Sequence, residues 1–348
     1  MGAGTLSAPR VLGRSDLKWT DYEAGRFGAR VADLARPLGA EKLGYNLQEI
    51  PPGKASVPYH AHFVNEELIA LLEGEAWVRL DDREHRLVAP ALVALPPGRE
   101  SAHQLLNRSA DPALALLAST MIPYEWVEYP DSGKRMFRLS GLPMEPPDVR
   151  KFVRDDGLVD PDPTTYFEGE PVDDPVGPPP EAGAEPDPRV VPFDAVDWEP
   201  NEWGPFRSER KRLGRAAGAR LLGASLWRLQ PGERNCPYHV HHVNEEAFFV
   251  LSGRAVLRTP DGEREVGPGD AMAFPPGPDG AHGFRGVGEE AVVFLALGTM
   301  EAPEIAEYPD SGKVYVMGGT APGGDMAGRT LDLVFRRTDA VDYWEGES

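Results

Sequence analysis

Short apolar runs, broken by Gly, Pro or Asp, recur along this chain. The first half contains "LIALLEG", "EAWVRL", "LVAPALVALPPG" and "PALALLAS" between Leu68 and Ser119. The second half contains "AFFVLSG", "RAVLRT", "DAMAFPPG" and "AVVFLAL" between Ala247 and Leu297. Short strands with turn signals about every eight to twelve residues predict an all-β sandwich or barrel.

The second half repeats the first at an offset of 179 residues. The run "EYPDSGK" at Glu128–Lys134 reappears unchanged at Glu307–Lys313. Further on, "YFEGE" at 166–170 is answered by "YWEGE" at 343–347, at an offset of 177. A repeat of this length predicts a domain of about 150 residues copied in tandem, because solenoid units are much shorter.

A proline-rich acidic segment separates the two copies. Residues 171–189 contain seven prolines and five acids. This composition does not support a core of its own and is typical of an extended spacer. We therefore expect a first domain over 1–170, a linker over 171–189 and a second domain over 190–348.

Six of the eight histidines lie at three repeated positions. Residues i and i+2 of a strand share a face, so His60 and His62 project together. His103 follows a distant "PPG" turn and reaches the same point only inside a closed barrel. An acid lies five residues after His62, at Glu67. Three imidazoles and one carboxylate that converge in an apolar barrel predict a divalent transition-metal site, and the second copy repeats the set.

The spacing of these residues resembles the two motifs of the cupin superfamily. The first motif is a glycine, His-x-His, three or four residues, Glu, six residues and Gly; it is matched by Gly53, His60, His62, Glu67 and Gly74, and by Gly232, His239, His241, Glu246 and Gly253. The gap to the last glycine selects Glu67 over Glu66 and Glu246 over Glu245. The second motif is matched by Pro96, Gly98, His103 and Asn107, and by Gly269, Pro275, Gly277 and His282.

Departures from the second motif affect turns rather than ligands: Pro90 and Gly286 replace its glycine and asparagine, and the spacing before the histidine is two residues longer. The resemblance implies a bicupin with two tandem jelly-roll β-barrels (double-stranded β-helices), and "EYPDSGK" is similar to small bacterial cupins without an assigned activity. Each domain is then expected to hold one divalent metal, Mn, Fe, Ni, Co, Cu or Zn, among which the sequence does not choose. The expected ligands are His60, His62, Glu67 and His103, and His239, His241, Glu246 and His282.

Strand alternation from the ligands predicts apolar pockets, lined by Ile69, Leu71 and Leu105 in the first copy and by Phe248, Val250 and Phe284 in the second. The aromatic rings predict a smaller second pocket. Arg79 and Arg258 are expected to face outward rather than to anchor a substrate. In each "EYPDSGK" loop we expect an Asp–Lys pair that closes the loop over the barrel.

Three functions are compatible with this pattern. The resemblance favours a metal-dependent oxidoreductase, similar to bicupin dioxygenases and decarboxylases, acting on a small organic substrate. A sugar isomerase or lyase needs acid–base and hydroxyl-binding groups that the expected lining lacks. A non-catalytic module that binds or senses a small molecule also stays open.

Composition limits the partners and the compartment. The net charge of −20 disfavours nucleic acids and anionic membranes as partners. A single cysteine, Cys236, excludes an intrachain disulfide. No apolar stretch has the length of a membrane span and no leader is recognisable, so we expect a cytoplasmic protein. The resemblance also allows homo-oligomers that associate through the cupin domains.

Overall fold

The computed structural model describes residues 11–81, 83–139, 149–154, 157–159, 166–180 and 185–347. Strands dominate these residues, which confirms the all-β prediction. The chain divides into two compact units: Met1–Asp197 with Lys211–Ser225, and Trp198–Arg210 with Leu226–Ser348. The domain boundary within 171–189 stays a prediction.

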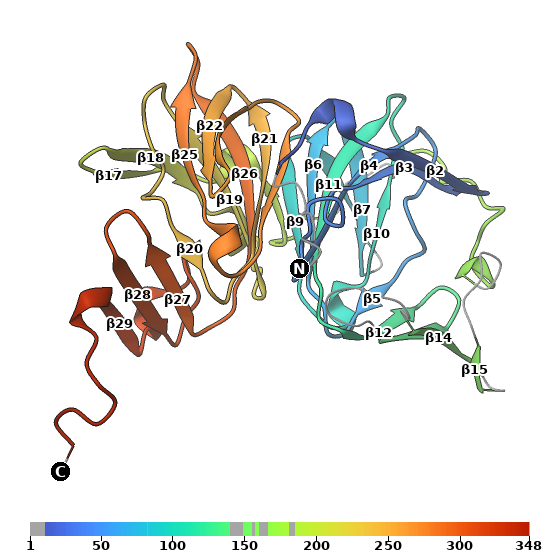
Figure 1. Ribbon diagram of the computed structural model, residues 1–348. Coiled ribbons are helices and arrows are strands. Elements are labelled where there is room, and N and C mark those ends of the chain that lie inside the picture. The colour runs from blue at the N-terminus through green and yellow to red at the C-terminus, as the bar shows by residue number, and fades with distance from the viewer. Residues whose placement is uncertain are drawn as a thin grey trace, which may run out of the picture. The chain divides into compact units, whose positions relative to one another are not determined.

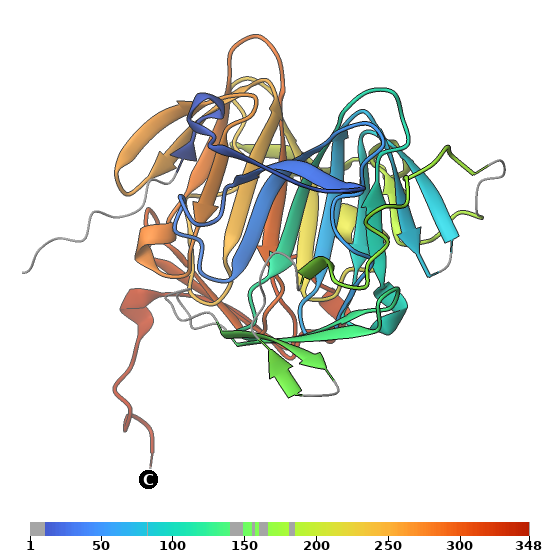
Figure 2. The ribbon, with the colours of Figure 1, turned by 90° about the vertical axis from the view of Figure 1, so that its right-hand side faces the viewer.

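The first unit contains a seven-stranded sheet, seen in Figures 1 and 2. Its strands lie in the order β16 (Val190–Pro192), β9 (Ala91–Leu95), β6 (Glu67–Glu73), β11 (Ala113–Thr120), β4 (Leu43–Ile50), β3 (Phe27–Asp33) and β2 (Trp19–Ala24). A three-stranded sheet has the order β10 (His103–Leu106), β7 (Glu75–Leu80) and β8 (Arg83–Val88). A third sheet comprises β15 (Gly157–Val159), β14 (Val149–Arg154), β13 (Lys134–Leu139), β12 (Tyr124–Tyr129) and β5 (Ala61–His62).

One buried cluster joins the large sheet to the three-stranded sheet. Its members come from β3, β4, β6, β9 and β11 on one side and from β7, β8 and β10 on the other. The cluster includes the three residues expected to line the first pocket, Ile69, Leu71 and Leu105. Apolar side chains from two facing sheets therefore form the interior of a barrel.

The second unit repeats these elements. Strands β24 (Ala271–Phe274), β21 (Glu246–Ser252) and β26 (Val292–Thr299) pair side by side, and β17 (Glu199–Trp203) pairs with β18 (Phe206–Lys211). A three-stranded sheet comprises β23 (Gly262–Val266), β22 (Arg254–Thr259) and β25 (Gly283–Val287). A four-stranded sheet comprises β20 (Val240–His241), β27 (Glu304–Tyr308), β28 (Lys313–Gly318) and β29 (Leu331–Arg336). After β29 comes a 3-10 turn (Arg337–Asp339), and the chain then runs on in an irregular segment to its C-terminal end (Figure 1).

Two further strands are β1 (Val11–Leu12) and the eight-residue β19 (Leu222–Leu229). The other elements are short: a single helical turn α2 (Leu213–Ala216) and several 3-10 turns, among them Arg99–Ser101 and Pro278–Gly280. In the described part of the chain, no helix is long and apolar enough to cross a membrane.

Residues 171–180, expected to be part of a spacer, pack against the first unit. Val176 is buried with Phe27 and Trp77 in one cluster. Arg108 donates hydrogen bonds to the carbonyl oxygens of Gly177 and Pro178. Proline stiffens this segment, but its valines and carbonyl groups still contact the barrel wall.

Candidate metal centres

Backbone pairing brings the first set of histidines together. His60 and His103 exchange both of their backbone hydrogen bonds, with N–O distances of 3.1 and 2.8 Å. His62 lies in β5, and Glu67 begins β6. This pairing across the barrel wall explains how residues distant in sequence reach one point.

The Glu67 carboxylate lies beside all three imidazoles. Its oxygens lie 3.9 Å from His60 Nε2, 3.5 Å from His62 Nε2 and 3.1 Å from His103 Nε2. Glu66 is fully buried, but its carboxylate instead accepts backbone N–H groups from Arg220, Leu221 and Leu222. The two adjacent acids thus have separate roles.

The second domain reproduces this arrangement. Oxygen Oε2 of Glu246 lies 3.9 Å from His239 Nε2, 3.4 Å from His241 Nε2 and 3.1 Å from His282 Nε2. His239 and His282 form the same reciprocal backbone pair as in the first domain. Both expected ligand sets therefore converge, each around its own glutamate.

Hydrogen bonds at Nδ1 orient the imidazoles. His60 Nδ1 donates to Pro58 O at 2.9 Å and His103 Nδ1 donates to Ser101 O at 3.0 Å. His239 and His282 make the same contacts with Pro237 O and Gly280 O. A proton held at Nδ1 leaves the Nε2 lone pair directed toward the glutamate, as metal ligation requires.

A second buried acid, Glu125, supports the first site and was missed in the sequence. It accepts a hydrogen bond from His62 Nδ1 at 3.2 Å. It also accepts backbone N–H groups from residues 63–65 and the side-chain amide of Asn65. Glu125 therefore fixes both the ring of one ligand and the loop that leads to Glu67.

Glu304 has the same contacts in the second domain, with backbone N–H groups of residues 242–244 and with the Asn244 amide. Its Oε2 lies 3.3 Å from His241 Nδ1. The signal was present in the sequence, because Glu125 and Glu304 are matched acids three residues before each "EYPDSGK".

Burial and neighbouring charges separate the pKa values within each site. Burial, together with the other imidazoles, lowers the pKa of His60 well below its usual range and that of His239 to about 3. Burial also opposes charge on His241, but the carboxylates of Glu246 and Glu304 raise its pKa to about 10. The histidines, despite burial, hold the pKa of Glu246 well below its ordinary value.

Four buried phenylalanines surround the second site. The Phe274 ring stacks on His282 at a centroid distance of 4.0 Å, and Phe248 lies 5.5 Å from the same imidazole. Phe248 also contacts Phe284 and Phe294. The corresponding residues of the first domain are Ile69, Leu95, Leu105 and Ala115. Val250 is buried as well. That the first pocket is larger stays a prediction.

The expected Asp–Lys pair in the "EYPDSGK" loops is wrong. Asp131 instead forms two hydrogen bonds with Arg79, at 2.6 and 2.9 Å, and Asp310 pairs in the same way with Arg258. The Arg79 guanidinium also lies over the Tyr59 ring, 3.8 Å from its centroid. A planar guanidinium binds a carboxylate in a bidentate manner and stacks on a ring, which an ammonium does not do equally well.

The donor set fits a divalent transition metal. One ligand atom each from His60, His62 and Glu67, and likewise from His239, Glu246 and His282, lie within 4.8 Å of one another. Nε2 of His282 is buried and lies 3.1 Å from Glu246 Oε2, so an imidazole nitrogen and a carboxylate oxygen face the same point. A divalent metal ion between them would bind both.

Comparisons with known proteins agree with this fold. A family model described as a cupin domain matches residues 46–119 and again 225–298. Oxalate decarboxylase from Bacillus subtilis superposes with a TM-score of 0.53 at 17% identity, covering 85% of this chain and 77% of its own. The Lactobacillus farciminis oxalate decarboxylase in its formate complex gives 0.52 at 17% identity, covering 85% and 87%.

A sugar phosphate isomerase of the cupin superfamily from Silicibacter pomeroyi is 28% identical, with a TM-score of 0.36, over 42% of this chain and 92% of its own. No curated protein sequence matches the chain.

The fold and its paired His–Glu clusters define a two-barrel protein with one candidate divalent-metal site in each barrel. Residues 46–119 and 225–298 are two cupin domains in tandem, so the chain is a bicupin.

Proposed function

We propose that this bicupin is a metal-dependent enzyme with one divalent transition metal per domain, acting on a small organic substrate by dioxygenase- or decarboxylase-type chemistry. The ligands are His60, His62, Glu67 and His103, and His239, His241, Glu246 and His282. The observation that carries the proposal is the presence of two equivalent clusters of three imidazoles and one carboxylate, each beside an apolar interior.

The residues of the chain supply binding, orientation and exclusion of water. The carboxylates of Glu67 and Glu246 neutralise part of the charge of a divalent ion, and the Nδ1 contacts hold the imidazoles in one tautomer. Apolar side chains such as Leu105 and Phe284 keep the surroundings dry, which strengthens electrostatic interactions there. A bound divalent metal would supply Lewis-acid polarisation and an open coordination position for substrate.

Comparison with known bicupins narrows the first choice of metal and substrate. Mn(II) centres are described for the Bacillus subtilis oxalate decarboxylase. Oxalate is a short dicarboxylic acid, so Mn and short dicarboxylic acids are the first metal and substrates to assay. The similarity to that enzyme extends to the fold only.

The test is turnover by protein loaded separately with Mn, Fe or Ni. We expect oxygen uptake or carbon dioxide release with at least one member of a panel of short carboxylic acids, catechols, diketones and flavonols. The double variant Glu67→Ala/Glu246→Ala, which lacks a ligand at each site, should show no turnover. Epimerisation of a sugar without oxygen uptake would contradict the proposal in favour of an isomerase. Tight binding without turnover would favour a sensing module.

Exchanging one aromatic ring tests the predicted difference in pocket size. We expect Phe248→Ile, which introduces the residue found at position 69, to enlarge the second pocket and to lower the free energy of unfolding by about 1–3 kcal/mol. The reciprocal Ile69→Phe should crowd the first pocket and destabilise by a similar amount. Urea denaturation and crystal structures of both variants provide the measurements. If Phe248→Ile left stability and cavity size unchanged, the prediction would fail.

A further inference from the structure

In the first domain, the "YFEGE" segment (Tyr166–Glu170) covers a depression beside the "EYPDSGK" loop. The Phe167 ring stacks on Phe27 at a centroid distance of 5.2 Å. Tyr166 meets Tyr129 edge-on at 6.0 Å. Phe27 is 0% exposed and Tyr129 is 2% exposed. The segment therefore lies over two aromatic side chains that are fully buried.

The retained Ser and Lys of the loop hold this segment. Lys134 Nζ donates to the carbonyl oxygens of Tyr166 and Glu168, both at 2.8 Å. It also lies 2.7 Å from the buried carboxylate of Glu170, which accepts a further hydrogen bond from Ser132. These contacts give a structural reason for Ser and Lys in "EYPDSGK", which apolar packing does not require.

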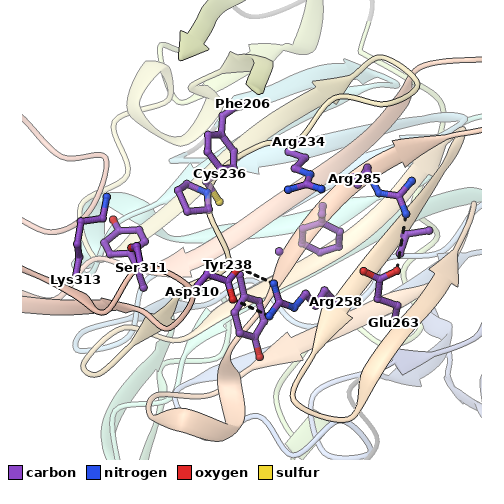
Figure 3. A pocket seen from close by; sticks show the side chains of 15 residues that line it. Phe206, Arg234, Cys236, Tyr238, Arg258, Glu263, Arg285, Asp310, Ser311 and Lys313 are labelled. Atoms are coloured by element: carbon purple, nitrogen blue, oxygen red, sulfur yellow. Dashed lines mark hydrogen bonds and ion pairs between the residues drawn. The ribbon is translucent and has the colours of Figure 1, made fainter. Parts of the chain in front are cut away.

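The second domain presents the same depression as an open cavity of about 260 Å³, drawn in Figure 3. Its lining includes the counterparts of the covered residues, namely Phe206, Tyr308, Ser311 and Lys313. Phe206 and Tyr308 are partly exposed, unlike Phe27 and Tyr129. Among the described residues, no acid forms an ion pair with Lys313.

The second copy of the segment, "YWEGE" (Tyr343–Glu347), lies in solvent with the same turn already formed. Tyr343 is 83% exposed and Trp344 is 73% exposed. Glu347 N donates to Trp344 O at 3.2 Å, as Glu170 N donates to Phe167 O at 3.1 Å. The glycines of the two turns have φ angles of +82° and +75°, a conformation that favours glycine.

The chain is already attached at the rim of the cavity. Arg337 N donates to the carbonyl oxygen of Gly312 at 2.9 Å, between Ser311 and Lys313. Tyr343 follows six residues later, after the 3-10 turn Arg337–Asp339, and a chain of six residues spans at most about 20 Å. This short tether gives the segment a high effective concentration at the cavity.

We propose that Tyr343–Glu347 docks into this cavity as an internal strap. Trp344 then packs on Phe206, Tyr343 packs on Tyr308, and Glu347 pairs with Lys313 and Ser311. The cavity and the strap differ from their first-domain counterparts in a complementary way. In the cavity, Val256 replaces Trp77, which leaves room for a larger ring, and in the strap Trp344 replaces Phe167.

Docking would also shield one side of the second metal centre. Tyr308 stacks against His239 at 6.3 Å, and Cys236 Sγ lies 3.6 Å from His239 Nδ1. Both side chains line the cavity, so the strap would cover them. The strap would contact Tyr308 and Cys236, which pack against the candidate ligand His239, and not His239 itself. Docking is measured without an activity assay, so this proposal can be tested separately from the proposed function.

Hydroxyl-radical footprinting with mass spectrometry tests docking in the full chain. Trp203 is 80% exposed and serves as an internal standard. We expect Trp344 to react about fivefold more slowly than Trp203, as for a docked population of about 80%. Lys313→Ala should bring the two rates together. Equal rates in the unaltered protein would overturn the proposal.

A disulfide provides a second test. A Cβ placed on Gly169 would lie 3.3 Å from Ser132 Cβ, close to the separation of about 3.8 Å in disulfides. We therefore expect Ser311→Cys/Gly346→Cys to form an intramolecular disulfide in a Cys236→Val background, Val being the residue at position 57. Because the positive φ of Gly346 disfavours Cys, the yield is compared with that of Ser132→Cys/Gly169→Cys, where the glycine has a similar φ and the segment is docked.

The matched control is Thr259→Cys/Gly346→Cys, which carries its first cysteine on the β22–β23 turn and should not cross-link. Covalent dimers from the test pair would contradict docking within one chain, because they would show that a second copy supplies the segment. Binding of acetate in the cavity, with Trp344 as reactive as Trp203, would instead assign the cavity to small anions.

Discussion

His62→Ala is expected to lower the metal content from about two ions per chain to about one, and His241→Ala to do the same at the other site. Each variant removes one imidazole from a set of four ligands and leaves three groups in place. The double variant should bind no metal at either site. Elemental mass spectrometry after dialysis measures the ratio of metal to protein.

These variants should still fold, because the barrel core consists of apolar residues such as Leu71 and Val78. Circular dichroism and size-exclusion chromatography check this point. His242→Ala is the control, since His242 lies next to His241 but its ring is directed to Glu307, 3.1 Å away. Two ions retained in His62→Ala, or none bound by the unaltered protein in Mn, Fe, Ni or Zn, would contradict the ligand assignment.

Glu125→Gln is expected to weaken metal binding at the first site by about 10–100-fold and to destabilise the metal-free protein by about 2–4 kcal/mol. The carboxylate accepts from His62 Nδ1 and from the N–H groups of residues 63–65. A glutamine side chain has only one acceptor oxygen. Its NH₂ group is a donor and would face N–H groups that are donors too. Some buried N–H groups therefore lose their partners, and the His62 ring loses its orientation.

Metal titration and urea denaturation of the same samples separate the two effects. Glu304→Gln should reproduce both at the second site only. Glu75→Gln is the control, because Glu75 pairs with a mostly exposed Arg86 and should cost less than about 1 kcal/mol. If Glu125→Gln and Glu75→Gln behaved alike, Glu125 would have no positioning role.

The sequence by itself determined the fold class, the duplication and the convergence of the ligands. Strand alternation placed His60 and His62 on one face, because side chains of a strand alternate between two faces, and His103 was expected to reach them inside a closed barrel. In the structure, His60 and His103 form a backbone pair. The choice of Glu67 over Glu66 came from motif spacing, and the structure gives each acid a different set of contacts.

The tertiary structure decided which polar groups meet. Asp131 lies two residues after the end of β12, yet its partner, Arg79, lies on β7. Lys134 contacts Glu170, and Glu125 contacts His62. Long flexible side chains pair with whichever charged group lies near them in the folded protein. A sequence pattern specifies the face of a strand on which a side chain lies, but not which groups of other strands lie near it. The open cavity of the second domain also emerged only in three dimensions, because it depends on whether a matched segment lies over its aromatic residues.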